Sequence, residues 1–220
     1  MTGLLDFGEG QGWLFDPADE PERKEDLDQW FTDPKLAQEF VDWCHIPPPG
    51  DGKVIRVIEP TAGCGNLVKP LVAAGAVIDA YDLDPQWIAY LRKHYGPDKT
   101  SLVTVHDAGD FLDVPLPEEL FDVCVMNPPL SGGMDGVFLR HLCFHWARRT
   151  CAIVQTRTMH SIDRRKKLWD RVKVKRIEFL SDRPSFGRGS PMRDFSFVEI
   201  EMRNEPRGQG DKDLTEVGFL

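Results

Sequence analysis

The chain has 220 residues, which is enough for one domain and leaves no room for a second large one. Hydrophobic residues make up 41% of it, and no apolar run approaches the roughly 18 residues of a membrane span, so we expect a soluble, cytoplasmic, globular protein. The net charge of −9 is unevenly spread, because residues 140–207 hold 17 Lys and Arg against 8 Asp and Glu, whereas the rest holds 10 against 28.

The first 29 residues are predicted to form an acidic, flexible arm. They carry nine acidic and two basic side chains and four glycines, with no sustained apolar period. We expect residues 30–203 to form the domain and residues 204–220 to form a polar, frayed C-terminal tail.

A helix is expected at the start of the domain. Asp33 suits an N-cap and Pro34 suits the first helical position. Apolar residues then recur at helical spacing to about Cys44. The proline- and glycine-rich stretch at residues 47–52 should end this helix.

From residue 54 onward, predicted strands and helices alternate. Strands are expected at residues 54–58, 77–81, 102–105, 121–126 and 152–155, and helices at 66–74, 85–95 and 137–149. This alternation predicts an α/β fold with a parallel, doubly wound sheet. The strands expected at 172–180 and 195–202 are separated by one glycine- and proline-rich loop, so they predict an antiparallel hairpin that ends the sheet.

Ligands of open parallel sheets bind at the carboxyl ends of the strands, and the first such end carries a glycine turn. The turn reads Glu59-Pro60-Thr61-Ala62-Gly63-Cys64-Gly65-Asn66. Gly63 and Gly65 leave room for a ligand to approach the backbone, and the turn exposes amides at a helix start. Packing in a tight turn explains the two glycines as well, and the third glycine of a dinucleotide fingerprint is missing.

The next two strand ends carry acidic side chains. Asp82 can accept hydrogen bonds from both ribose hydroxyls of a nucleoside cofactor, whereas Asp84 before Pro85 is expected to cap the following helix. The third end reads Asp107-Ala108-Gly109-Asp110-Phe111-Leu112, and a carboxylate there can accept from an adenine amino group, with Phe111 against the ring. An Asx turn explains an isolated aspartate there equally well.

The fourth strand end, Asn127-Pro128-Pro129-Leu130, is the most specific signal in the chain. The two prolines stiffen the backbone, so the Asn127 amide oxygen and the Pro128 carbonyl become convergent acceptors for a planar amino group. Such contacts strengthen as the nitrogen becomes tetrahedral, which stabilises the transition state of an attack by that nitrogen. A strand-ending turn is the alternative for this stretch alone, and the other three loops favour the functional interpretation.

Taken in this order, these four strand ends resemble the motifs of class I S-adenosylmethionine-dependent methyltransferases, specifically N6-adenine DNA methyltransferases of the small phage and prophage type. The resemblance covers about residues 30–203 and implies a Rossmann-like methyltransferase fold. It implies catalysis by Asn127, Pro128, Pro129 and Leu130. It also implies cofactor contacts from Phe31, Thr32, Glu59, Ala62, Gly63, Gly65, Asp82, Asp110, Phe111 and Asn127.

Two departures from the family's pattern bear on the substrate. The catalytic motif of the family usually ends in an aromatic residue that stacks on the target base, whereas this chain has Leu130. Phe186, in the loop of the predicted hairpin, is our candidate for the missing ring, with packing under the loop as the alternative. No target-recognition domain follows the hairpin, which predicts relaxed sequence specificity.

Basic side chains are predicted to lie beside the catalytic edge. Arg164, Arg165, Lys166 and Lys167 could contact phosphates, and a solvated, salt-bridged surface is the alternative. His141 and His145 share one helical face, but no further ligand is recognisable, so we expect no metal. The five cysteines show no paired spacing, and we expect them to be reduced.

The sequence therefore predicts a methyltransferase that moves a methyl group from S-adenosylmethionine to the N6 amino group of adenine in DNA. Three alternatives stay open at this point. The acceptor could be adenine in RNA, or a glutamine amide in a protein, since Asn-Pro-Pro also serves those amides. A noncatalytic binding protein that keeps the fold is the third.

Overall fold

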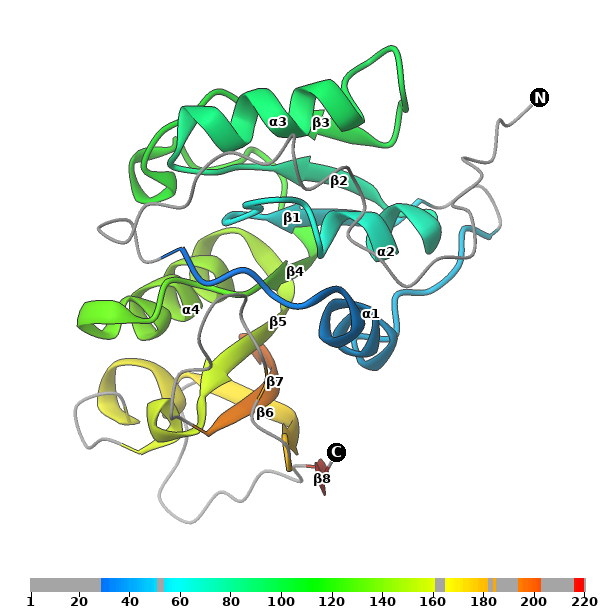
Figure 1. Ribbon diagram of the computed structural model, residues 1–220. Helices are drawn as coiled ribbons and strands as arrows, with labels where there is room; N and C mark the ends of the chain where they lie inside the picture. The colour runs from blue at the N-terminus through cyan, green and yellow to red at the C-terminus, as the bar shows by residue number, and fades with distance from the viewer. Residues whose placement is uncertain are drawn as a thin grey trace.

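Figure 1 shows the computed structural model of the chain, which describes residues 29–50, 54–160, 165–181, 184, 194–202 and 216–219. Residues 1–28 of the predicted arm and residues 204–215 and 220 of the predicted tail lie outside the described residues, as do Arg164 and Phe186. The assignments made to those residues therefore stay predictions.

One mixed sheet runs through the molecule. Its strands are β1 (Arg56–Glu59), β2 (Val77–Ala80), β3 (Val103–Val105), β4 (Phe121–Met126), β5 (Ala147–Gln155), β6 (Val172–Phe179), β7 (Phe195–Met202) and β8 (Glu216–Phe219), in the order β3-β2-β1-β4-β5-β7-β6-β8. β1 to β5 pair in parallel, and β7 is antiparallel to both β5 and β6. The predicted parallel sheet with a terminal hairpin is confirmed, and its order reverses between β1 and β4, where a crevice is expected.

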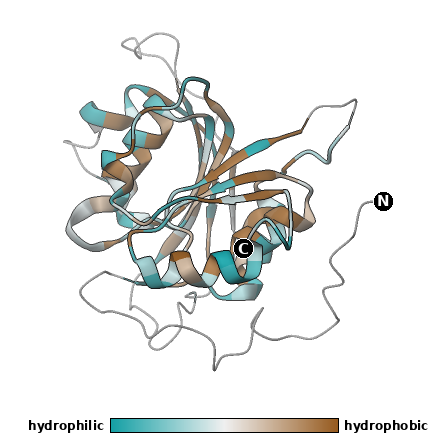
Figure 2. Cartoon of the chain, turned by 90° about the horizontal axis from the view of Figure 1, so that it is seen from above, coloured by the Kyte–Doolittle hydropathy of each residue, from teal (hydrophilic) through white to brown (hydrophobic). Residues whose placement is uncertain are grey.

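Helices cover both faces of this sheet (Figure 1). The described helices are α1 (Pro34–Trp43), α2 (Val68–Ala73), α3 (Pro85–Tyr95) and α4 (Met134–His145), with the single-turn segments η3 (Phe111–Asp113), η4 (Ser131–Gly133), η5 (Thr156–Met159) and η6 (Arg165–Trp169). α1, α2 and α3 share one core cluster with the sheet, and α4 shares another. In Figure 2 the strands run through the middle and are largely hydrophobic, as expected of a sheet buried on both faces.

The predicted boundaries differ from the structure around β5. The expected helix at 137–149 instead spans Met134–His145, and β5 begins at Ala147 rather than at residue 152. The cause is pairing with β4, because Ala147 lies opposite Phe121, and the Phe121 amide donates to the Trp146 carbonyl at 2.8 Å. Pairing to a neighbouring strand thus overrides the helical pattern of the residues before it.

The predicted frayed tail also differs from the structure, since Glu216–Phe219 form β8. This strand pairs in parallel with β6, with Glu216 opposite Arg176 and Phe219 opposite Phe179. Without it, β6 would present an open row of backbone donors and acceptors. The polar composition of the tail therefore did not exclude an edge strand.

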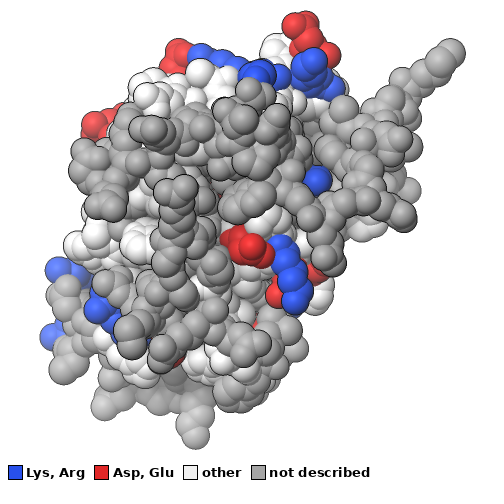
Figure 3. Space-filling model, in the orientation of Figure 1, with Lys and Arg blue, Asp and Glu red and all other residues white. Residues whose placement is uncertain are grey.

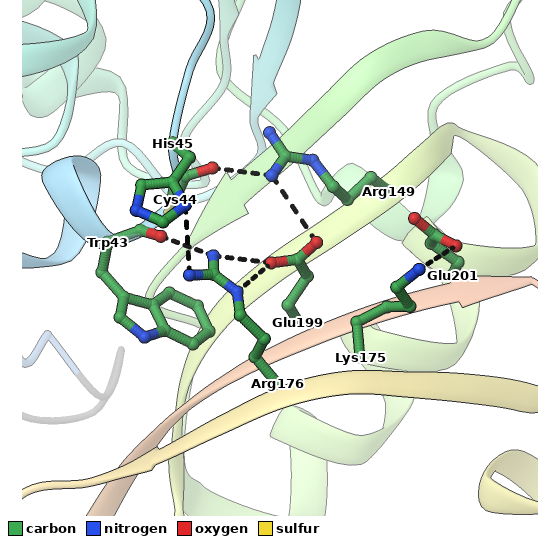
Figure 4. A network of polar contacts seen from close by, with 8 residues as sticks. All are labelled: Trp43, Cys44, His45, Arg149, Lys175, Arg176, Glu199 and Glu201. Carbon is green, nitrogen blue, oxygen red and sulfur yellow. Dashed lines mark hydrogen bonds and ion pairs between the residues drawn. The ribbon is translucent and has the colours of Figure 1, made fainter. Parts of the chain in front are cut away.

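A buried ionic network holds the C-terminal end of α1 against the antiparallel part of the sheet (Figure 4). Arg149 donates to the Cys44 carbonyl at 2.6 Å, and Arg176 donates to the Trp43 carbonyl at 2.5 Å. Glu199 on β7 joins both guanidinium groups, at 3.6 Å from Arg149 and 2.7 Å from Arg176. The last carbonyls of a helix lack partners within it, so these two arginines complete α1 and orient the residues that precede it.

Glu199→Ala should lower the free energy of unfolding by about 3 kcal/mol, because it leaves two largely buried guanidinium groups without their carboxylate. Glu201→Ala on the same strand is the matched control, since Glu201 pairs with Lys175 at 3.6 Å and both side chains are more than a third exposed. We expect the control to change stability by less than about 1 kcal/mol. Urea denaturation measures both values, and equal values would contradict this role for Glu199.

Candidate active site

A cavity opens at the carboxyl ends of β1, β2 and β4, next to the reversal of strand order. Among the residues predicted to form the site, those that line it are Phe31, Asp82, Asp110, Phe111, Asn127, Pro128 and Pro129. They come from four separate stretches of the chain, and the parallel sheet brings them together. The other residues predicted to form the site are not part of this lining, and all of them are buried: Thr32, Glu59, Ala62, Gly63, Gly65 and Leu130.

The glycine turn after β1 packs tightly against its neighbours. Gly63 and Gly65 have φ angles of +49° and +81°, a region that L side chains rarely adopt. A Cβ at Gly63 would lie 2.7 Å from the Phe31 ring, and one at Gly65 would lie 2.9 Å from Leu91. Both glycines are therefore required by packing, and the turn presents Pro60 and Thr61 to the cavity.

Asp82 ties the end of β2 to this turn. Its Oδ2 accepts from the Gly63 amide at 2.8 Å, and its Oδ1 accepts from the Asp84 amide at 2.9 Å. Burial raises the pKa of Asp82, and these two hydrogen bonds act in the opposite direction. As predicted, Asp84 caps α3, where it accepts from the Gln86 amide at 3.0 Å.

Asp110 and Phe111, which follow β3, also line the cavity. Asp110 is exposed, and it accepts from the Leu112 amide at 2.9 Å, which is the Asx turn that the sequence allowed. Phe111 is buried among aromatic rings, with centroids 5.1 Å from Tyr81 and 4.6 Å from Trp146. The carboxylate keeps free acceptor positions toward solvent, and the ring is fixed by its neighbours.

Asn127 presents an acceptor without a partner. Its Nδ2 donates to the Trp30 carbonyl at 3.0 Å and to the Thr32 hydroxyl oxygen at 3.1 Å. These bonds use both amide hydrogens, so they determine which end of the carboxamide is the oxygen. Asn127 Oδ1 is buried and has no hydrogen-bond partner among the residues that the structure describes, which is costly unless a ligand supplies a donor.

Glu59 lies fully buried beneath the same loops. Its Oε1 accepts from the Thr61 amide at 2.9 Å and lies 3.0 Å from the Thr61 hydroxyl, which in turn lies 3.2 Å from the Asn127 carbonyl. Burial raises the pKa of Glu59 to about 8, with the hydrogen bonds from Thr61 opposing the shift and the nearby Asp82 adding to it. Glu59 is therefore mostly protonated at neutral pH.

Leu130 packs in the core rather than at the cavity wall. Its side chain is 2% exposed and belongs to the cluster on the side of α1, α2 and α3. The structure therefore does not place the last residue of the predicted catalytic motif where it could stack on a ligand in the cavity.

Sequence reasoning missed contributors from three other places. Trp30 acts through its backbone carbonyl, which no residue pattern reveals. Gln29 lines the cavity and donates to Asp84 at 3.0 Å, and Met134 and Phe138 of α4 complete the wall. Thr61 was visible within the glycine turn, but its contact with Asn127 depends on the pairing of β1 with β4.

The basic segment after β5 is described in part. Lys166 and Lys167 are exposed on η6, while the side chain of Arg165 lies outside the described residues. In Figure 3, Lys and Arg side chains gather at the lower left, in the region of η6. Arg171 nearby lies over the Phe144 ring, 4.4 Å from its centroid.

Within the described part of the chain, no group of three His, Cys, Asp or Glu side chains is arranged to hold a metal ion. His141 Nε2 instead accepts from the Trp146 indole at 2.9 Å, which occupies one of the two histidines noted in the sequence. None of the helices described is long and apolar enough to cross a membrane.

No family model matches the chain. It is 32% identical over 100 residues to a ribosomal RNA small subunit methyltransferase of Arabidopsis thaliana, a match that covers 44% of this chain and 27% of the relative. It is 28% identical over 127 residues to ribosomal RNA small subunit methyltransferase A of Aromatoleum aromaticum, covering 57% and 42%. The chain thus spans less than half the length of the curated relatives that it matches.

The solved structures show the fold. The crystal structure of a dimethyladenosine transferase from Plasmodium falciparum superposes with a TM-score of 0.57 and 19% identity, over 79% of this chain and 63% of that one. At this identity the likeness concerns the fold alone. The chain has a Rossmann-like methyltransferase fold.

Proposed function

We propose that this protein is an S-adenosylmethionine-dependent methyltransferase that acts on the exocyclic N6 amino group of adenine in a nucleic acid. The observation that carries the proposal is the buried, unpartnered Asn127 Oδ1 at the carboxyl end of β4. A donor is needed there, and an amino group is a donor that a methyltransferase would also use as its nucleophile.

The cavity fits the cofactor. S-adenosylmethionine supplies a methyl group on a positively charged sulfur. Asp82 accepts one backbone N–H on each oxygen and keeps further acceptor positions for ribose hydroxyls, while Phe111 offers an apolar wall beside Asp110. The acidic residues around the glycine turn favour a cationic ligand.

The Asn-Pro-Pro turn would act on the acceptor amino group. Asn127 Oδ1 and the Pro128 carbonyl can each accept one amino hydrogen, which directs the nitrogen lone pair toward the methyl donor. Hydrogen bonds to the two hydrogens strengthen as the nitrogen gains positive charge, so they stabilise the transition state more than the bound substrate. The proton lost after transfer passes to solvent.

The comparisons help to choose between RNA and DNA as the substrate. The sequence predicted DNA, but the two curated relatives are ribosomal RNA methyltransferases by name, and the Plasmodium falciparum neighbour is a dimethyladenosine transferase. These names support adenine in RNA ahead of adenine in DNA. DNA is the second candidate, because the Glu59-Pro60 opening of the glycine turn resembles the DNA enzymes.

Lys166 and Lys167 are suited to contact the phosphates of this polymer, because they are exposed on η6 after the carboxyl end of β5. Arg164, Arg165 and Phe186 stay predicted contacts. Leu130 carries no aromatic ring and is buried in the core, so in this proposal a ring that stacks on the base comes from another residue.

Asn127→Ala should lower methyl transfer about 100- to 1000-fold, because one preorganised contact to the transition state is lost. Tritiated methyl transfer from S-adenosylmethionine to adenine-containing RNA, to DNA and to protein measures the effect and identifies the acceptor. Calorimetry should show that the variant binds the cofactor nearly as the wild type does. Undiminished turnover in the variant would sink the mechanism, and transfer to protein alone would move the proposal to an amide substrate.

Asp82→Asn should weaken cofactor binding by about 1.5 to 3 kcal/mol, because the ribose loses charged acceptors. Asn keeps one oxygen for the backbone contacts, so the substitution disturbs the glycine turn less than alanine would. Asp107→Asn is the matched control, since Asp107 lies outside the cavity, is exposed and pairs with Arg92 at 2.7 Å. Equal affinities of the two variants in calorimetry would remove Asp82 from the binding site.

The affinity for S-adenosylmethionine should rise relative to that for S-adenosylhomocysteine, which lacks the positive sulfur, as pH increases from 6 to about 8. The reason is the sign of the Glu59 shift, because the carboxyl is neutral below its pKa of about 8 and becomes an attractive anion above it. Glu59→Gln should remove this dependence. A ratio of affinities that does not change with pH in the wild type would show that the ionisation of Glu59 does not affect the bound sulfonium.

A further inference from the structure

We propose that Thr32 is a positioning residue, whose hydroxyl group holds the Asn127 carboxamide in the orientation that leaves its oxygen as the acceptor for the amino group of the substrate. The inference rests on the proposed function, and it replaces the cofactor contact that the family resemblance implies for Thr32. Thr32 itself touches neither cofactor nor substrate in this proposal, since it is not part of the lining of the cavity.

The orientation of a carboxamide is otherwise ambiguous. Rotation of the Asn127 amide by half a turn would exchange Oδ1 and Nδ2 and would present a donor to the amino group, which is itself a donor. The Trp30 carbonyl at 3.0 Å opposes this exchange, because it can only accept, and the Thr32 hydroxyl oxygen at 3.1 Å accepts the second amide hydrogen. The amide hydrogens therefore point toward residues 30–32, and the oxygen is left for the ligand.

Thr32 is itself held in place. Its side chain is 4% exposed, and its carbonyl accepts from the Asn66 side chain at 2.8 Å. Asn66 is the last residue of the glycine turn, so Thr32 links this turn to the loop after β4 that holds Asn127. On its other side, Asp33 caps α1 and accepts from the Lys35 amide at 2.9 Å.

The residues before Thr32 add contacts to the cofactor loops. Phe31 packs edge-on against Trp87, with centroids 4.6 Å apart, and covers Gly63. Gln29 donates to Asp84 at 3.0 Å. The short segment Gln29–Asp33 therefore contacts the loops after β1, β2 and β4, and a shift in this segment would turn the carboxamide of Asn127.

The test uses an isosteric pair and a matched control. Thr32→Val keeps the shape but removes the acceptor, and it should lower kcat about 10- to 100-fold, since small misplacements of reacting groups have effects of this size. The KM for the nucleic acid and the Kd for S-adenosylmethionine should change less than about threefold. Thr32→Ser restores the hydroxyl and should return kcat to within about threefold of the wild type. Thr150→Val is the control, because Thr150 is fully buried on β5 and its hydroxyl has no partner.

Two results would overturn the proposal. A weaker Kd for the cofactor with unchanged kcat in Thr32→Val would return Thr32 to cofactor binding. Equal losses of kcat in Thr32→Val and Thr32→Ser would show that packing, rather than the hydroxyl, is required.

A spectroscopic readout separates this proposal from the proposed function. The side-chain amide signals of Asn127, assigned by their absence in Asn127→Asp, should show two hydrogen-bonded protons in the wild type. In Thr32→Val one of them should shift upfield and exchange faster, while Thr150→Val leaves both unchanged. If the amide signals behave in this way but the protein transfers no methyl group, the proposed function is rejected and the positioning contact is kept. If both Asn127 amide protons in the wild type are unbonded, the contact is rejected whether or not the protein transfers methyl groups.

Discussion

Two hydrogen bonds from one carboxamide connect the parts of this site. Asn127 reaches residues 95 and 97 positions earlier in the chain, at Thr32 and Trp30. Each neutral hydrogen bond contributes only about 1 kcal/mol to stability, so their importance lies in direction. They leave a buried oxygen without a hydrogen-bond partner among the described residues, and a donor group on a ligand would satisfy it.

The contacts that anchor α1 link the position of Asn127 to the antiparallel end of the sheet. Asp33 begins the helix directly after the segment that holds Asn127, and Arg149 and Arg176 complete the other end through carbonyls of residues 43 and 44. Glu199 holds both arginines (Figure 4). The antiparallel hairpin thus has a structural effect on the cavity although it contributes no side chain to the described lining.

Near the cavity, burial affects the charge of the side chains more than the acidic composition of the chain does. The chain as a whole is acidic, with a net charge of −9, but its fully buried Glu59 is mostly neutral at pH 7 because burial raises its pKa to about 8. A neutral carboxyl avoids repulsion with Asp82 in the ligand-free protein, and its ionisation would match a positive charge on a bound cofactor. The stability and the binding properties of the site are therefore linked through one proton.

The amino-acid sequence alone determined those features that depend on neighbouring residues. Asp33 and Asp84 cap helices as predicted, the hairpin forms, and the Asn-Pro-Pro stretch ends a buried strand, because capping, turn geometry and strand periodicity are local properties. Only the tertiary structure decided where β5 begins, that β8 covers the edge, that Leu130 enters the core, and which way the Asn127 amide points. Each of these depends on a partner far away in the chain, and for Asn127 the partner is a backbone carbonyl that every residue type possesses.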